Sequence, residues 1–287
     1  MATLRVPLLI GSLALAWGSN FLWIKIALGT FGPFQLTVAR MVLGVLPLLA
    51  VLAVRREHLP RDRRTWGHLV VAALVGNTVP YTCFALGELR VDSGIAGSLN
   101  ATTPLWTLAL GLAARQFPRV RAAQLGGLLL GFAGCLLIFT PWDAGAVDPL
   151  GAAFCLLAGL SYGVSYLYLS RFLTPRHLTP TVLSASQLLA ACVLSAATLP
   201  LDPAGVPAWS PGPWLAVLVL GVLGSGLAYV INYALIRTEG AVGASVVTYL
   251  IPIASLALGF LVLGESVPPL ALAGVATILA GVRISRR

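Results

Sequence analysis

Apolar residues fill most of the chain in runs of about 20, and most charged residues fall in the short stretches between them. A helix of about 20 mostly apolar residues crosses a lipid bilayer. The pattern therefore predicts an all-α polytopic membrane protein with ten transmembrane helices. The expected spans are residues 6–29, 34–54, 66–87, 93–114, 121–140, 149–170, 180–200, 214–236, 241–263 and 268–284.

One apolar stretch occurs twice in the sequence. Pro104-Leu-Trp-Thr-Leu-Ala-Leu-Gly111 is followed 148 residues later by Pro252-Ile-Ala-Ser-Leu-Ala-Leu-Gly259, and glycines and prolines elsewhere keep nearly the same offset. The repeat predicts two five-helix units, residues 1–140 and 149–287. Because five is odd, the second unit must cross the membrane in the opposite orientation to the first. Inverted repeats of this kind are typical of secondary transporters.

Basic residues favour short cytoplasmic loops, so their positions predict the orientation of the chain. If both termini are cytoplasmic, fifteen loop and terminal arginines lie on the cytoplasmic side and Arg90 lies on the other. Losing one span would exchange the sides of every later loop, so this asymmetry supports the count of ten. In this arrangement Glu88 and Glu265 belong to the outer side.

The composition agrees with a membrane protein, since 58% of the residues are apolar and 9% are charged. A soluble domain has about 25% charged residues. The net charge of +9 would suggest nucleic acid in a soluble protein, but here the arginines lie in short loops, so we expect the lipid bilayer as partner and no nucleic acid. The four cysteines all fall inside apolar segments, where we expect no disulfide, metal or other cofactor.

Polar and aromatic residues recur at helical spacing inside three pairs of spans that the repeat relates, namely one and six, three and eight, and four and nine. Surrounded by hydrocarbon, such side chains normally face the helix bundle or a wet cavity. We therefore expect them to converge on one site for a small-molecule substrate. The candidate substrate-binding residues are Trp17, Asn20, Asn77, Tyr81, Asn100, Thr103, Tyr162, Ser165, Tyr229, Asn232, Tyr233 and Thr248.

Pro104 and Pro252 lie in the middle of spans four and nine. A proline removes a backbone donor and bends a helix, which frees carbonyl groups for a neighbour or a cavity. Symmetry-related helix breaks near the bilayer midplane point to a transport site. The alternative interpretation is that the two bends only shape helix packing.

Lys25 and Arg40 are the two cations predicted inside spans, as charge anchors or gates. Lys25 lies about 30 Å along its helix from Arg5 and could instead reach the outer interface. Arg40 lies about 9 Å inside the outer end of span two. Its partner would be a carbonyl, Glu265 at the outer rim, or an anionic group of the substrate.

None of the predicted spans contains Asp or Glu. Intramembrane aspartyl proteases need paired aspartates, so an enzyme is not expected and remains a remote alternative. Proton-driven transport usually needs an intramembrane Asp, Glu or His. The sequence therefore favours a facilitator or exchanger driven mainly by the gradient of the solute itself.

Glycine and alanine provide small faces on spans five and ten, at Gly127, Gly131, Gly134, Ala273, Gly274, Ala280 and Gly281. Small residues allow close helix approach in membranes, so we expect packing faces first. A homodimer contact along these faces is left open.

The sequence resembles the drug/metabolite transporter superfamily, specifically the ten-helix EamA-type transporters. The resemblance rests on Trp17-Gly18-Ser19-Asn20-Phe21 with Lys25, on Arg40, on the two prolines, and on Leu263-Gly264-Glu265. Many repeats of that family end their fourth helix with Gly-Glu, whereas this chain has Arg115-Gln116, which leaves Glu265 alone in that role.

The resemblance implies a multi-pass carrier of the bacterial inner (plasma) membrane that exports small metabolites, often amino acids or related solutes, by alternating access. The alternative is a multidrug exporter of hydrophobic or cationic compounds. Small relatives that expel cationic drugs use a membrane-embedded glutamate in their first helix, and this chain has no glutamate there.

Overall fold

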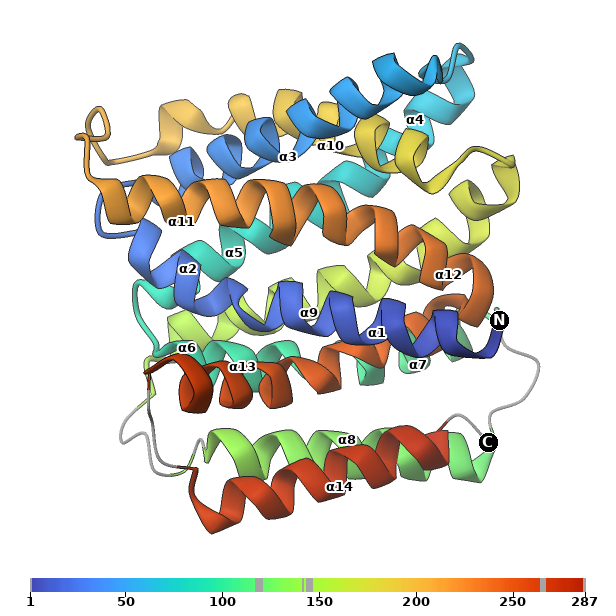
Figure 1. The fold of residues 1–287 in the computed structure, drawn as a ribbon, viewed down its shortest axis with the longest axis vertical. Helices are drawn as coiled ribbons and strands as arrows, with labels where there is room; N and C mark the ends of the chain where they lie inside the picture. The colour runs from blue at the N-terminus through green and yellow to red at the C-terminus, as the bar shows by residue number, and fades with distance from the viewer. Residues whose placement is uncertain (1, 117–120, 141, 143–146, 264–266, 286–287) are drawn as a thin grey trace.

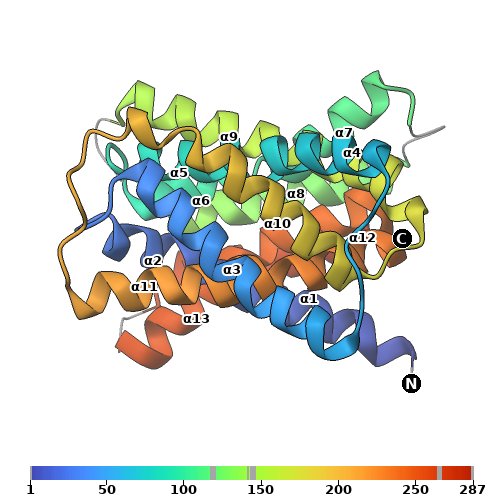
Figure 2. The ribbon, with the colours of Figure 1, turned by 90° about the horizontal axis from the view of Figure 1, so that it is seen from above.

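The computed structural model describes residues 2–116, 121–140, 142, 147–263 and 267–285. These ranges are helical and contain no strand. Most of the helices run side by side between the two ends of the molecule, horizontally in Figure 1, and Figure 2 gives the view from above. Both chain termini lie at the same end of the bundle (Figure 1).

The helices of the first unit pair into the five expected spans. They are α1 (Ala2–Gly18), α2 (Asn20–Ala27), α3 (Pro33–Arg55), α4 (Arg63–Ala73), the π-helical segment η1 (Leu74–Thr78), α5 (Val79–Glu88), α6 (Ser93–Asn100), α7 (Thr103–Ala113) and α8 (Ala122–Phe139). The first, third and fourth spans are thus each built from more than one helix.

The second unit follows the same plan. Its elements are α9 (Pro149–Tyr168), the π-helical segment η3 (Leu169–Leu173), the short helix η4 (Thr174–Arg176), α10 (Pro180–Ala196), the short helix η5 (Leu199–Leu201), α11 (Pro211–Gly221), the π-helical segment η6 (Val222–Leu227), α12 (Ala228–Ser245), α13 (Val247–Leu263) and α14 (Pro269–Ser285). Gly240 interrupts α12 with φ of 72° and ψ of −178°, a conformation that favours glycine, and it makes the turn between spans eight and nine.

Six stretches of the described residues are long and apolar enough to cross a membrane, and α10 and α14 are shorter apolar helices. The broken α6–α7 segment and α13 complete the ten expected spans. The chain is therefore an all-α membrane protein of ten helices in two repeats.

The two units pack against each other in pairs of equivalent contacts. Helix α5 packs on α9, and α11 packs on α2; α7 packs on α9, and α13 packs on α1. The first span of each unit thus lies against the third and fourth spans of the other. Helices α3 and α10, the second spans of the two units, pack against each other.

Helices α8 and α14 form a tight pair at the bottom of Figure 1. A Cβ added at Gly134 would lie 2.8 Å from the Gly274 carbonyl oxygen, and one at Gly281 would lie 2.6 Å from the Gly127 carbonyl oxygen. The small faces predicted from the sequence therefore pack against each other within this chain, so a homodimer contact on this pair would have to use its outward faces.

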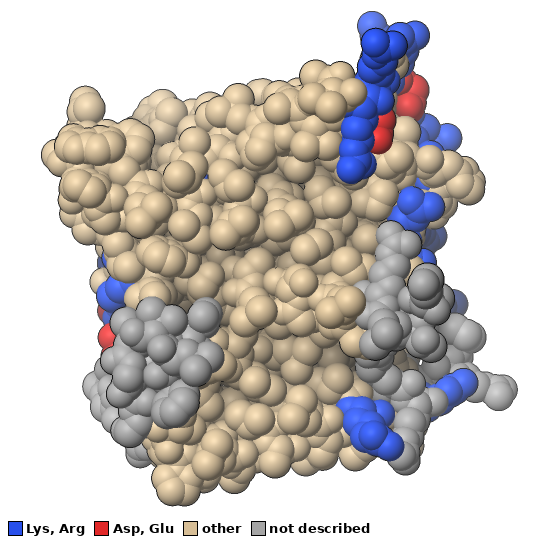
Figure 3. All heavy atoms as spheres, viewed as in Figure 1, with Lys and Arg blue, Asp and Glu red and all other residues tan. Residues whose placement is uncertain are grey.

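Lys and Arg gather at the end of the molecule where both termini lie (Figure 3). We call this the basic end; its described arginines include Arg55, Arg56, Arg63, Arg64, Arg171, Arg176 and Arg237. The broad surface between the two ends is almost free of charge in this view, as expected of a surface that faces lipid.

Candidate functional site

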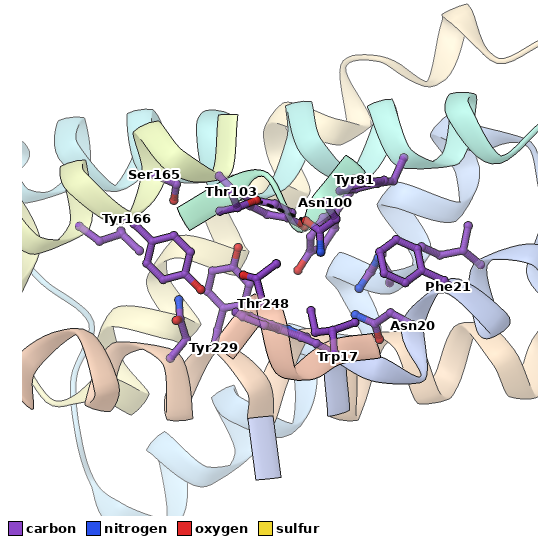
Figure 4. A pocket seen from close by; sticks show the side chains of 17 residues that line it. Trp17, Asn20, Phe21, Tyr81, Asn100, Thr103, Ser165, Tyr166, Tyr229 and Thr248 are labelled. Atoms are coloured by element: carbon purple, nitrogen blue, oxygen red, sulfur yellow. Dashed lines mark hydrogen bonds between the residues drawn. The ribbon is translucent and has the colours of Figure 1, made fainter. Parts of the chain in front are cut away.

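A cavity of about 50 Å³ lies between the helices near the middle of the bundle. Side chains from both units point into it (Figure 4). Its lining residues are Trp17, Asn20, Phe21, Ile24, Arg40, Tyr81, Phe84, Asn100, Thr103, Tyr162, Ser165, Tyr166, Leu169, Tyr229, Asn232, Thr248 and Ile251. Most of the predicted binding residues therefore meet in one place, and each of the three repeat-related span pairs contributes.

Aromatic rings form much of the wall. Phe21 and Phe84 meet edge to face with their centroids 5.5 Å apart, and Tyr162 lies 6.0 Å from Phe84 and 6.4 Å from Tyr81. Rings in such arrangements offer apolar contact and a negative π face at the same time. The cavity can therefore bind the apolar part of a solute and can also hold a cation.

Arg40 brings a positive charge into this aromatic wall. The residue is 3% exposed, its Nε donates to Ser225 Oγ at 3.1 Å, and its guanidinium carbon lies 3.8 Å from the centre of the Tyr81 ring. Its Nη2 is buried without a hydrogen-bond partner. A buried donor without a partner is costly, so this atom is suited to bind an acceptor from outside the protein. Glu265, one of the partners considered from sequence, lies outside the described residues.

The two π-helical segments place backbone carbonyls beside the cavity. Trp17 Nε1 donates to the Gly224 oxygen in η6 at 3.1 Å, and the Tyr229 hydroxyl donates to the Gly76 oxygen in η1. A π-helical turn disturbs the regular ladder of backbone bonds, and in a membrane those groups need another partner. Cavity-lining aromatic side chains supply it in both units.

Asn77 and Tyr233 do not line the cavity, contrary to the prediction from sequence. Gln187 Nε2 donates to Asn77 Oδ1 at 2.6 Å, and the Tyr233 hydroxyl donates to Gln187 Oε1. Both residues are fully buried. Their polar groups therefore serve helix packing between α10, η1 and α12.

Lys25 also lies outside the cavity. It is exposed, and its Nζ donates to the backbone oxygen of Glu88 at 2.9 Å. This position agrees with the alternative in which the side chain reaches the membrane interface. Of the two cations considered from sequence, Arg40 is thus the one that lines the cavity.

The two mid-span prolines behave differently. Helix α7 begins at Thr103 with Pro104 in its first turn, directly after the break at Ala101 and Thr102. Pro252 lies inside α13, and the interruption in span nine falls earlier, at Val246. The predicted break is therefore found at Pro104 and is displaced at Pro252.

Glu88 corrects the expectation that the spans hold no carboxylate. It is the last residue of α5 and of the apolar stretch Arg63–Glu88, and it is 1% exposed. The sequence pattern had ended the span one residue earlier, at Gly87. A signal was present, because Glu88 follows the cavity residue Phe84 by one helical turn and shares its face.

The list of candidate binding residues omits Phe21, Ile24, Phe84, Tyr166, Leu169 and Ile251. Two of these omitted residues lie on stripes visible in the sequence, since Phe84 continues the stripe of Tyr81 and Tyr166 shares the face of Tyr162. Ile24, Leu169 and Ile251 are aliphatic side chains in apolar helices, where nothing in the sequence separates a cavity wall from a lipid-facing surface. Phe21 follows Asn20 directly, so extending that polar stripe by one residue would have found it.

Comparisons with known proteins agree with this architecture. The EamA-like transporter family matches the chain twice, over residues 5–140 and 149–287. The probable terminal-alkyne amino-acid exporter of Streptantibioticus cattleyicolor is 30% identical over 94% of this chain and 90% of its own length. The uncharacterised inner membrane transporter YedA of Escherichia coli is 29% identical over 57% of this chain and 53% of its own.

A solved crystal structure aligns with the chain at a TM-score of 0.80 and 22% sequence identity. The alignment covers 98% of this chain and 96% of the other. At this level of identity the likeness shows that the fold is shared.

Proposed function

The chain belongs to the EamA-like transporter family, and on that premise we propose that it exports small amphipathic solutes that carry a carboxylate, amino acids above all, by alternating access. The family is one of membrane transporters. We further infer that the solute is an amino acid, that transport runs outward, and that the protein has no enzymatic activity. One relative, named as a probable amino-acid exporter, supports the choice of solute.

The observation that carries the proposal is the unpartnered Nη2 of Arg40 in an aromatic cavity. Guanidinium groups bind carboxylates through paired, charge-assisted hydrogen bonds. The neighbouring rings would contact the apolar part of the solute and face its ammonium group. An α-amino acid with an apolar side chain combines these three features.

The size of the cavity supports alternating access. About 50 Å³ is enough for a few water molecules, since one water needs about 10–15 Å³ of such space. An amino acid is larger than this, so the aromatic wall has to move before a solute enters. We therefore propose that the structure represents an occluded conformation.

We also propose that the protein lies in a bacterial inner membrane with both termini in the cytoplasm. The arginines of the basic end support this orientation, because basic residues favour cytoplasmic loops. The name of the Escherichia coli relative supports the choice of membrane.

A multidrug exporter is the second candidate, and the aromatic lining favours it because flat cationic drugs also stack on such rings. Arg40 argues against it, since a buried positive charge repels a cation. The two functions differ in the sign of charge that the solute must carry.

The test compares an amino acid with two cations, one of which has the same aromatic ring and amino group. Purified protein in proteoliposomes is assayed for uptake of L-phenylalanine and of phenethylamine, which lacks the carboxylate, with ethidium as a cationic drug. We expect phenylalanine to be transported in preference to both cations. Transport of phenethylamine and ethidium without phenylalanine would reject the amino-acid proposal and support the multidrug alternative.

A further inference from the structure

Arg40 and Glu88 are the only charged side chains buried among the described residues. They come from neighbouring helices, α3 and α5, which pack against each other. A buried charge is expensive in a membrane unless another charge or several hydrogen bonds compensate it. The two residues therefore have to be considered together.

Neither side chain has all its polar atoms satisfied. Glu88 Oε2 accepts a hydrogen bond from Ser93 Oγ at 3.0 Å, while Oε1 is buried without a partner. Arg40 Nη2 is likewise buried without a partner. The two side chains come from packed helices, but they form no ion pair in this conformation. One donor and one acceptor of opposite charge are thus both left open.

Lys25 does not fill this gap. It is the other cation beside Glu88, and its ammonium group bonds the backbone oxygen of Glu88 rather than the carboxylate. The remaining titratable group that interacts with Glu88 is the Cys155 thiol on α9, which is neutral near pH 7. Arg90 and Asp148 lie near the same end and pair with each other at 3.4 Å.

Glu88 lies just beyond the cavity and not in its lining. It follows Phe84 by one turn of α5, and Phe84 closes against Phe21. A solute held in the cavity therefore does not touch the carboxyl group, but it does reach Arg40.

We propose that Glu88 is a proton-binding site coupled to solute binding, because its carboxylate and the carboxylate of the solute compete for the single charge of Arg40. Without solute, the positive charge of Arg40 favours the ionised form of Glu88. When a solute carboxylate binds Arg40, the charge of Arg40 is neutralised and Glu88 takes up a proton from hydronium or a buffer acid. One O–H bond forms on Glu88, and the bond between the donor and that proton breaks. The inference rests on the proposed function, and it replaces the expectation of transport without proton coupling.

The linkage is measured by proton uptake. L-Phenylalanine is added to purified protein in weakly buffered detergent with a pH indicator dye, at a series of pH values from neutral to alkaline. At pH values where Glu88 is ionised before binding, the wild type should take up as much as about one proton per phenylalanine, and its affinity should weaken by up to about tenfold per pH unit as pH rises. Glu88→Gln, which has the shape of the protonated side chain, should bind phenylalanine at least as tightly, with no proton uptake and no such pH dependence.

Asp92→Asn is the matched control, because Asp92 is an exposed acid four residues from Glu88 in the same connection. It should behave as the wild type. Wild-type binding without proton uptake, or unchanged uptake in Glu88→Gln, would overturn the proposal. Loss of phenylalanine binding in Glu88→Gln would make Glu88 a partner of the solute ammonium group and would overturn it as well.

A measurement without solute separates the two proposals. In infrared difference spectra on acidification, one carboxylic-acid C=O band should stand apart from those of the exposed acids; it should appear in the wild type and in Asp92→Asn and be absent from Glu88→Gln. If phenylalanine does not bind but this band is present in the wild type and absent from Glu88→Gln, the proposed function has failed and Glu88 is still a proton-binding site. If the band persists in Glu88→Gln, Glu88 is not the proton site, whatever the solute.

Discussion

Gln187 donates a hydrogen bond to Asn77 at 2.6 Å, in the place where the repeat-related Arg40 donates to Ser225 at 3.1 Å. In both units the second span bonds the π-helical segment of the other unit. The two contacts differ in charge and in surroundings, since Arg40 lines the cavity and Gln187 does not. The same geometry thus lies beside the cavity in one contact and within the helix packing in the other.

Replacing Arg40 by glutamine, the residue at the repeat-related position 187, tests whether Arg40 binds the solute carboxylate. Arg40→Gln removes the charge but keeps a donor toward Ser225. We expect kcat/KM for phenylalanine in proteoliposomes to fall at least tenfold, which is about 1.4 kcal/mol, with the unfolding temperature little changed. Phenethylamine, which has no carboxylate, should not lose transport in this variant; equal losses for both solutes would contradict the role of Arg40 as carboxylate anchor.

Gln187→Leu tests whether Gln187, Asn77 and Tyr233 stabilise helix packing. It leaves Asn77 Oδ1 and the Tyr233 hydroxyl buried without their partner, and each such group costs about 1–3 kcal/mol. We expect a lower unfolding temperature and an unchanged KM for phenylalanine in the protein that remains folded. A raised KM with unchanged stability would show that Asn77 and Tyr233 contribute to solute binding and not to packing.

The orientation is tested by cysteine labelling in intact cells. His58 and Ala204 are exposed and lie in the loops that follow α3 and α10, at opposite ends of the bundle. A membrane-impermeant maleimide should label Ala204→Cys from outside and His58→Cys only after permeabilisation. Labelling of both from outside would exclude the ten-span arrangement. The sequence also predicts position 118 inside and 145 outside, and these lie outside the described residues.

Asp148 should stabilise the protein in a pH-dependent way. It begins α9, where the backbone N–H groups of Gly151 and Leu150, together with Arg90, hold the pKa of its carboxyl below the ordinary value of 3.8. A lowered pKa in the folded state adds stability above 3.8, and this stability is lost as pH falls through the folded-state value. Asp148→Ala should therefore lower the unfolding temperature at pH 7 more than at pH 3.

Asp148→Asn is the control for that measurement. Asparagine keeps an oxygen that caps the helix but has no charge. Its unfolding temperature should lie between those of the wild type and Asp148→Ala at pH 7. An equal effect of Asp148→Ala at both pH values would show that the charge contributes nothing.

The sequence by itself determined the class of fold and the two repeats. Apolar runs of bilayer length have one stable arrangement, since a helix satisfies its own backbone groups in lipid. The similar stretches that begin at Pro104 and Pro252 predicted two repeated units. The odd number of spans in each unit predicted that the two units cross the membrane in opposite orientations. Polar residues inside spans had to face inward, which is why Trp17, Asn100 and Tyr229 were found from spacing alone.

Only the tertiary structure decided which inward-facing residues line the cavity. Asn77 and Tyr81 lie one turn apart on one helix face, yet Gln187 covers Asn77 while Tyr81 stays open beside Arg40. The choice depends on a side chain that comes from 110 residues further along the chain. Glu88 was placed in a loop because hydropathy cannot show that α2 and α6 cover the end of α5 and bury its carboxyl group. The burial of a side chain depends on its neighbours in space, and the sequence around that residue does not show which distant residues these are.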